Sequence, residues 1–211
     1  MEKCKGKIIL VPHGSTEEHG YHLPLKTDAL IAERVCAEFY DSDEIVVAPT
    51  MRYTGMRSTK QVPGTVGPTS SEYEVVLRAI ISDFIKLEPK KILFFLAHDG
   101  TTNRKILDKL REEFGKDKMD YFSCSKYNVE AEESGILETG GHAGEGETSL
   151  ALLFDSENVH MDKAVDEKWP ENYTEVGISP SGVDGYPTKA TLEKGKKMLE
   201  FYKDNLRTLL K

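Results

Sequence analysis

The chain has no uninterrupted apolar run approaching the roughly 20 residues of a membrane-spanning helix, and its N-terminus lacks the pattern of a secretory signal. A Pro-, Gly- or Ser-rich linker, an internal repeat and a low-complexity tract are also missing, so we expect a single domain over residues 1–211. Its three cysteines, Cys4, Cys36 and Cys124, have neither metal-binding nor redox spacing. We interpret them as reduced thiols of a cytoplasmic protein, with no membrane partner.

The chain also has fewer basic residues than acidic ones. The 28 Lys and Arg residues are outnumbered by 36 Asp and Glu residues, which gives a formal net charge of -8. This balance argues against a polyanion such as nucleic acid as the partner, although a local basic spot can still hold a phosphate. The chain also lacks the Gly-rich phosphate-binding motif of P-loop enzymes.

What the chain does have is an alternation of apolar runs and helical periodicity. The pattern predicts strands over residues 7–11, 44–48, 91–97 and 119–124, and helices over 28–40, 71–87, 103–114, 147–154 and 188–209. Thr27 or Asp28 is expected to cap the first helix, and Ser71 with Glu74 resembles a capping box for the second. The alternation predicts an α/β fold with a mostly parallel sheet flanked by helices on both faces.

Acids and histidines gather directly after the first predicted strand. Glu17, His19 and Asp28 offer two oxygens and a nitrogen, a set that Zn²⁺, Mn²⁺ and Fe²⁺ accept. Glu17 and His19 are two residues apart, so an extended backbone would place both on one face. The alternative is a polar turn in which Gly20 and Pro24 only redirect the chain.

Two further groups of this kind follow other apolar segments. His142, Glu145 and Glu147 lie at the start of the predicted helix 147–154, where the two acids could simply complement the helix dipole. His98 directly follows the apolar run 92–97; a lone histidine there is more often structural. Because sites in open α/β sheets form beyond the carboxyl ends of the strands, the three groups are expected to meet at one edge.

These residues carry a resemblance to a known family. The stretch Glu17-x-His19-Gly20-x-His22-Leu23-Pro24 with Asp28, and the stretch 142–149, resemble the two signature motifs of the creatininase (creatinine amidohydrolase) family. Residues 63–65 and 182–195 are similar to further blocks of that family, in the same order. The family includes creatinine amidohydrolases, an archaeal formamidopyrimidine-nucleotide deformylase of flavin and deazaflavin biosynthesis, and a peptide-processing member.

The resemblance implies a centre of two divalent metal ions per chain, Zn, Fe or Mn, in which a metal-bridged hydroxide hydrolyses a C–N amide bond of a small molecule. The matching ligands are Glu17, His19, His98 and the bridging carboxylate Asp28. His142 matches the proton-transferring histidine, and Glu147 the acid near the metals. Which of Glu145, Glu147 and Asp99 completes the second metal site stays open, as do the roles of His13, His22 and His160. The family also implies a homo-oligomer, with a hexamer as the expected form.

The chain departs from the family pattern at Gly100, where creatinine hydrolases carry a glutamate two residues after the third ligand. We therefore expect a formamide on a phosphorylated pyrimidine nucleotide to be a better substrate than creatinine. The long loop 49–68, with Arg52, Arg57 and Lys60, would hold the phosphate or pack on a neighbouring subunit. Trp169 is expected in a subunit contact or a pocket wall.

Three alternatives stand beside this hypothesis. They are a creatinine amidohydrolase proper, an inactive regulatory subunit that binds metal, and a two-metal hydrolase of phosphate esters.

Overall fold

Four short apolar runs form the parallel sheet on which the molecule is built. The computed structural model describes residues 4–56, 59, 61–169 and 179–211. The strands are β1 (Ile8–His13), β2 (Ile45–Val47), β3 (Lys91–Leu96) and β4 (Met119–Ser123), and they lie in the order β2-β1-β3-β4. All pairs are parallel, with Ile8 opposite both Ile45 and Lys91. The predicted α/β fold is confirmed.

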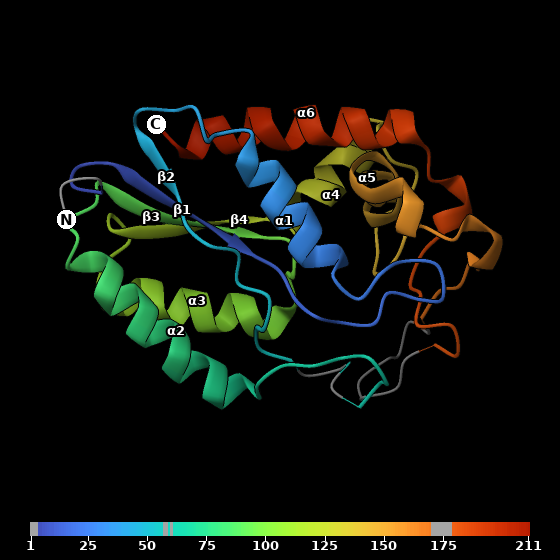
Figure 1. Cartoon of the computed structure of the whole chain (residues 1–211), viewed down its shortest axis with the longest axis horizontal. Coiled ribbons are helices and arrows are strands. Elements are labelled where there is room, and N and C mark those ends of the chain that lie inside the picture. The colour runs from blue at the N-terminus through green and yellow to red at the C-terminus, as the bar shows by residue number, and fades with distance from the viewer. Residues whose placement is uncertain (1–3, 57–58, 60, 170–178) are drawn as a thin grey trace.

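Helices cover both faces of this sheet (Figure 1). Helices α2 (Ser70–Ile85) and α3 (Thr101–Phe114) lie on one face, and α1 (Thr27–Ala37) and α6 (Leu192–Leu209) on the other. Successive side chains of a strand point to opposite faces, so Ile9 and Val11 pack with α2 and α3, whereas Ile8 and Leu10 pack with α1 and α6. Covering on both faces explains why all six residues of β1 are buried.

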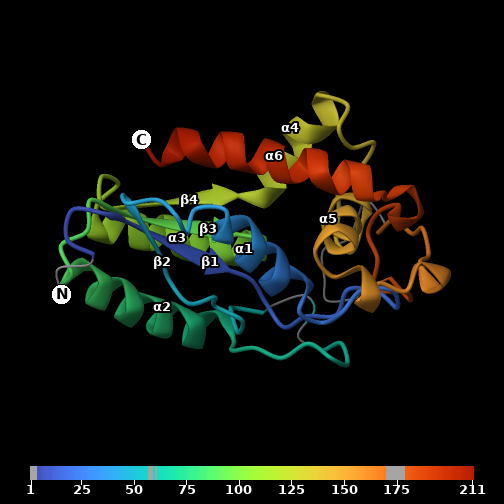
Figure 2. The ribbon, with the colours of Figure 1, turned by 45° about the horizontal axis from the view of Figure 1, so that its top comes forward.

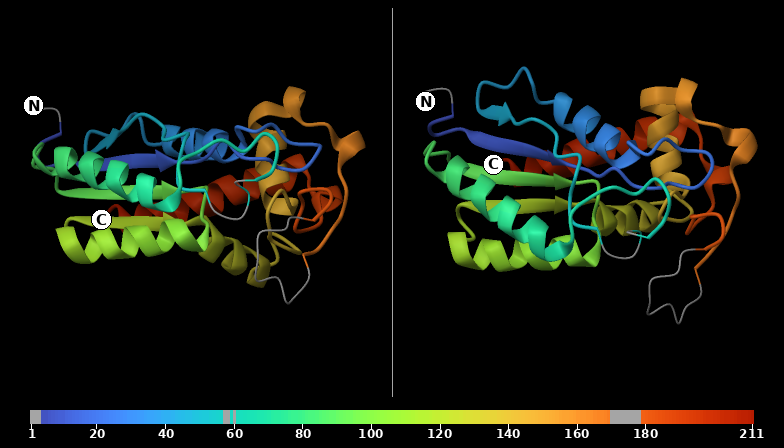
Figure 3. Two further views of the ribbon diagram at one scale, coloured as in Figure 1. Left: turned by 90° about the horizontal axis from the view of Figure 1, so that it is seen from below. Right: turned by 60° about the horizontal axis from the view of Figure 1, so that its bottom comes forward.

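Two further helices lie beyond the carboxyl ends of the strands. Figures 2 and 3 show α4 (Cys124–Glu133) and α5 (Glu145–Asp155) at the end of the molecule opposite the two chain termini. Short 3₁₀ turns, η1 (Ser156–Asn158), η2 (Met161–Lys163) and η3 (Pro187–Lys189), complete the connections. Helix α4 is absent from the sequence-based prediction, and it begins directly where β4 ends. This end of the molecule carries the candidate site.

All five predicted helices begin at a different residue in the structure, and three of these differences concern the caps. The last helix begins at Leu192 rather than at 188, because Pro187 opens a separate 3₁₀ turn and the Thr191 side chain caps α6. Helix α2 has its capping box at Thr69 and Glu72, two residues before the predicted pair. In α1 neither predicted residue is the cap.

At the start of α1, the cap position is Lys26, which makes no side-chain cap bond. Thr27 instead donates its hydroxyl proton to the carbonyl oxygen of Pro24 at 2.6 Å. Asp28 is left free to point away from the helix backbone into the site, as the sequence analysis expected.

No helix within the described part of the chain is both long and apolar enough to cross a bilayer. The three cysteines are free thiols, and burial raises the pKa of Cys36 and Cys124 well above the ordinary value.

Candidate active site

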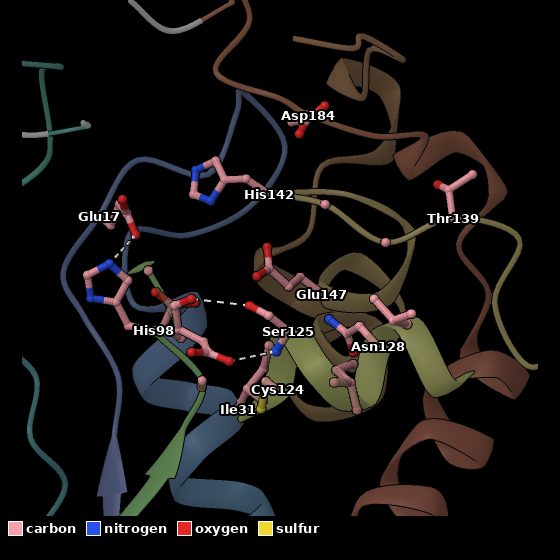
Figure 4. Close-up of a pocket in the computed structure, with 18 of the residues that line it drawn as sticks. Glu17, Ile31, His98, Cys124, Ser125, Asn128, Thr139, His142, Glu147 and Asp184 are labelled. Atoms are coloured by element: carbon pink, nitrogen blue, oxygen red, sulfur yellow. Dashed lines mark hydrogen bonds and ion pairs between the residues drawn. The ribbon is translucent and has the colours of Figure 1, made fainter. Parts of the chain in front are cut away.

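Polar side chains from separate parts of the chain meet at the carboxyl edge of the sheet, around a cavity of about 770 Å³. Figure 4 shows residues of the loop after β1, the loop after β3, helix α4 and the segment around α5 lining this cavity. The predicted convergence of the three acid and histidine groups at one edge is therefore observed. The cavity is deep enough to reach Ile31 of α1 and Tyr202 of α6.

Six of the predicted site residues form three overlapping groups, one of which consists of Glu17, His19 and His142. Of the other two groups, Glu17, Asp28 and His98 make up one, and His19, Asp28 and Glu147 make up the other. Within each group one potential ligand atom per residue lies within 4.8 Å of the others. Asp28 belongs to both of these latter groups, which is the arrangement expected of a carboxylate shared between two ions. Among the three acids left open by the sequence, Glu147 is the one that joins the second of these two.

The orientation of the His98 imidazole is fixed by contacts to Nδ1, the ring nitrogen that lies away from the cavity. The hydroxyl of Thr54 donates its proton to the carbonyl oxygen of Gly14 at 2.7 Å, and its oxygen lies 2.7 Å from Nδ1 of His98. The side-chain amide of Asn103 lies 3.2 Å from the same Nδ1 atom. Nε2 of His98 then faces the cavity, 3.4 Å from a carboxylate oxygen of Glu17. Fixing one ring nitrogen so that the other is free for metal is how proteins commonly orient histidine ligands.

His19 is held in the same way. Its Nδ1 lies 3.1 Å from the carbonyl oxygen of Glu17, while its Nε2 lies 3.2 Å from Asp28 and 3.6 Å from Glu147. Burial lowers the pKa of His19, but Asp28, Glu147 and Glu17 raise it more, so that it stands well above its ordinary value. Burial raises the pKa of Asp28, yet the charge and hydrogen bond of His19 lower it overall.

This donor set fits divalent cations. Three carboxylates and two imidazoles converge with their donor atoms inward, and burying several acids together is costly unless positive charge compensates them. Oxygen and imidazole donors of this number suit Zn²⁺, Mn²⁺ or Fe²⁺.

His142 borders this cluster and contacts a residue to which the sequence analysis assigned no role. Its ring lies 4.5 Å from that of His19 and 6.2 Å from that of Trp169, measured between centroids. Nε2 of His142 lies 2.9 Å from the main-chain oxygen of Glu18 and 3.2 Å from its carboxylate. Burial and His19 lower the pKa of His142, but the Glu18 hydrogen bond, together with Glu17 and Glu147, raises it to about 9.

Two functional neighbours were missed by sequence reasoning. Glu18 stands directly between two predicted ligands, so the pair of consecutive acids at 17 and 18 was the available signal. Thr59 donates a hydrogen bond to the carboxylate of Glu17 from the distant loop 49–68. No sequence signal marks Thr59, because its role depends on how that loop closes over the site.

The other two candidate acids, Asp99 and Glu145, make structural hydrogen bonds and ion pairs. Asp99 accepts hydrogen bonds from the Ser123 hydroxyl at 2.5 Å and the Ser125 amide at 2.8 Å, and it pairs with Arg104 at 3.0 Å. Glu145 accepts two backbone amides at 2.9 Å and an ion pair from a lysine of α6. Neither acid belongs to the three groups described above.

The remaining histidines lie outside the three groups. His22 is buried against the hydroxyl of Thr148 at 2.9 Å, and His13 against that of Tyr73 at 2.6 Å. Burial lowers the pKa of His22 to about 4 and that of His13 to about 3. Both side chains are thus held within the scaffold, whereas His160 is exposed.

The expected phosphate-binding residues do not line the cavity as far as the structure describes them. Arg52 pairs with Glu33 at 2.7 Å and points elsewhere, whereas Arg57 and Lys60 lie outside the described residues. The cations among the described lining residues are instead Arg104 and Lys168. Trp169 also lines the cavity, which agrees with the pocket-wall alternative.

Comparison with known proteins settles the family. The family model described as "Creatinine amidohydrolase" matches residues 1–210. This chain belongs to the creatininase family. It is 30% identical over 208 residues to a mycofactocin precursor peptide peptidase of Mycolicibacterium smegmatis, covering 90% of this chain and 79% of that protein. It is 23% identical over 209 residues to the creatinine amidohydrolase of Pseudomonas putida, covering 90% and 80%.

Solved structures agree on the fold. A crystal structure of creatinine amidohydrolase superposes with a TM-score of 0.81 at 19% identity, covering 97% of this chain and 89% of that one. Other creatininase structures are described as a Zn-Zn type and as a manganese form, and both superpose with a TM-score of 0.78 at 21% identity, covering 99% of this chain and 90% of theirs. The chain is thus a creatininase-family hydrolase with a donor set suited to metal.

Proposed function

We propose that this creatininase-family protein hydrolyses a C–N amide bond of a small molecule, with two divalent ions held by Glu17, His19, Asp28, His98 and Glu147. The observation that supports this proposal most is the position of Asp28 in two of the donor groups. When bound, two such ions supply an activated water and polarise the amide carbonyl. The protein's part is to orient the donors, which Thr54 and the main chain at residue 17 do through the Nδ1 atoms of His98 and His19.

Proton transfer falls to His142. An amide nitrogen leaves poorly as an anion, so it needs a proton as the C–N bond breaks. His142 lines the cavity beside the donor cluster, and its hydrogen bond to Glu18 raises the pKa of its ring, which favours the form that carries a proton. Glu147 lies on the same side of the cavity and adds negative charge that favours the protonated ring.

A formamide on a phosphorylated pyrimidine nucleotide is the leading substrate candidate. At Gly100 the cavity lacks the glutamate that creatinine hydrolases carry, which disfavours creatinine. The volume of about 770 Å³ accommodates a ligand much larger than creatinine. Arg104 and Lys168, rather than the basic residues of loop 49–68, are the cations placed to meet a phosphate.

A peptide amide is the second candidate. It is favoured by the 30% identity to a peptidase that acts on a precursor peptide, the highest identity among the relatives compared above. The two candidates differ in whether a phosphate or a peptide backbone is recognised beyond the scissile bond.

The test is a screen of metal-reconstituted protein against creatinine, other cyclic amides, formamidopyrimidine nucleotides and short peptides. We expect a formamide to be hydrolysed faster than creatinine. His142→Ala should retain its metal but lose roughly 10²–10⁴-fold in rate, the range typical of a removed general acid. The matched control is His160→Ala, an exposed histidine, which should behave as wild type.

Equal rates for His142→Ala and wild type would remove this residue from the mechanism. Creatinine hydrolysed faster than every formamide would overturn the substrate assignment. If no amide were hydrolysed by the fully metal-loaded protein, the inactive regulatory subunit would become the better account.

A further inference from the structure

Glu18 occupies an unusual place for an acid, buried in the loop between β1 and α1 and only 6% exposed. One carboxylate oxygen lies 3.2 Å from Nε2 of His142, and the other accepts the backbone amide of Gly20 at 3.2 Å. Nε2 of His142 has a second oxygen neighbour, the main-chain carbonyl of Glu18 at 2.9 Å. Because both neighbours of Nε2 are acceptors, that nitrogen must carry the hydrogen.

Two glycines lie close to the carboxylate of Glu18. Gly20 and Gly182 both have positive φ angles, +65° and +74°. A Cβ atom at Gly182 would collide with a carboxylate oxygen of Glu18, so a side chain there would displace the acid. The block 182–195, which the proposed chemistry leaves without a role, thus packs against Glu18.

The same block also holds His142 from behind. The amide of Asp184 donates to the carbonyl oxygen of His142 at 2.8 Å. Gly141 has a φ of +115°, and a Cβ atom there would collide with the carbonyl oxygen of Asp184. Segments far apart in the sequence therefore fix Glu18 and His142 relative to each other.

We propose that Glu18 is a positioning residue for His142. By accepting Nε2–H, it sets the ring plane and the tautomer, and it leaves Nδ1 as the nitrogen that faces the substrate. Nδ1 of His142 has no hydrogen-bond partner among the described residues. The substrate-facing part of this assignment rests on the proposed function, whereas the tautomer does not.

A glutamine cannot replace Glu18 in this arrangement. The two carboxylate oxygens face two N–H donors, and an amide offers one acceptor and one donor group. Whichever way the amide of Glu18→Gln turns, one of the two hydrogen bonds is lost. The substitution keeps the shape of the side chain, so it separates positioning from packing.

The experiment compares zinc-loaded wild type, Glu18→Gln, Glu18→Ala and the control Glu33→Gln, whose acid makes an exposed pair with Arg52. Long-range ¹H–¹⁵N spectra report the tautomer of each of the six histidines, and His142→Ala assigns the relevant signal. At a pH at which the His142 ring is neutral, we expect hydrogen on Nε2 rather than on Nδ1 in wild type and in Glu33→Gln. Both Glu18 variants should lose this preference or show a mixture of tautomers.

Kinetics and metal content complete the test. Both Glu18 variants should retain their zinc, and kcat should fall roughly 10–100-fold with KM nearly unchanged, the effect typical of removing such a supporting partner. Wild-type kcat together with an intact Nε2–H signal in Glu18→Gln would overturn the proposal. Loss of zinc from Glu18→Gln would overturn it as well, since it would indicate a role in holding metal.

Failure of the proposed function is distinguishable from failure of this inference. If wild type hydrolyses no amide, the proposed function fails, but the tautomer spectra still decide whether Glu18 fixes His142. If Glu18→Ala does not fold, the shape-conserving Glu18→Gln gives the answer.

Discussion

Gly100 is the single position at which this chain departs most clearly from the creatinine hydrolases of its family, and the space beside it is open. Its φ of −69° and ψ of 147° suit any residue. A Cβ atom there would have only one neighbour within 4 Å, Nε2 of His98 at 4.0 Å. A longer side chain at this position can therefore reach the donor cluster without disturbing the backbone.

The comparison of Gly100→Glu with Gly100→Gln tests this reading. The two variants share shape and differ in the carboxylate, so only the glutamate should add a metal donor. We expect Gly100→Glu to hold its ions at chelator concentrations that strip wild type and Gly100→Gln, and to hydrolyse creatinine faster than either. Identical metal retention in the two variants would contradict the placement of Gly100 beside the ions.

The convergence of the donor side chains was predictable because acids and histidines directly after apolar strands, supported by the family resemblance, indicate a common site. Glu17, His19, Asp28, His98 and Glu147 lie together as that reasoning expected. Thr54 and Thr59 were not predictable, because their contacts with His98 and Glu17 form only when loop 49–68 folds back over the loop after β1. Spacing along the chain carries no information about such closure.

The N-terminus of α2 offers a direct check on how local sequence selects a helix start. Two candidate capping boxes lie two residues apart, Ser71 with Glu74 and Thr69 with Glu72. The structure uses Thr69, whose hydroxyl accepts the backbone amide of Glu72 at 3.4 Å while the Glu72 side chain accepts the amide of Thr69 at 2.8 Å. Glu74 instead pairs with Arg78 and Lys109.

Thr69→Ala should therefore destabilise the protein by about 1 kcal/mol, the usual cost of removing a cap, whereas Ser71→Ala should cost less than about 0.5 kcal/mol. Urea unfolding of metal-loaded protein measures both. In thermal unfolding the first change corresponds to a fall of roughly 2–4 °C for a chain of this size. A larger loss in Ser71→Ala than in Thr69→Ala would favour the capping box expected from sequence.

Helices with long amphipathic patterns were predictable, and α4 was not. Its buried residues are Cys124, Tyr127 and Ala131, which have the right spacing but carry little apolar signal among polar neighbours. The helix also begins directly after the last residue of β4 without an intervening turn, since Ser123 is both strand end and N-cap. Its position is fixed by packing against α6 and by the bonds from Ser123 and Ser125 to Asp99.

We propose that copies of this chain associate into a homo-oligomer, and exposed apolar side chains support this proposal. Loop 49–68 exposes two large apolar side chains, Tyr53 at 61% and Val66 at 55%, and Leu25 lies beside them against Gly64. Thr16 joins the two parts of the loop through a hydrogen bond to Arg52 and a bridge to Val66. A group of exposed apolar side chains is typical of a subunit contact.

Light scattering at micromolar concentration should therefore return a multiple of the 23.7 kDa chain mass, with a hexamer expected. Tyr53→Ser combined with Val66→Ser should reduce that mass. Val75→Ser, which changes an exposed valine on α2, should leave it unchanged. A wild-type mass near that of one chain would refute the proposed assembly.

The two-ion centre is most directly tested by elemental analysis of metal-reconstituted protein after exhaustive dialysis. Wild type should contain about two divalent ions per chain, the number expected of a site that clamps both the attacking water and the scissile carbonyl. Asp28→Ala should contain almost none, because the carboxylate belongs to two of the donor groups. Asp83→Ala, which removes an exposed partner of Lys86, should match wild type. Full metal content in a folded Asp28→Ala, or a single ion in wild type, would contradict the shared carboxylate on which the proposed reaction depends.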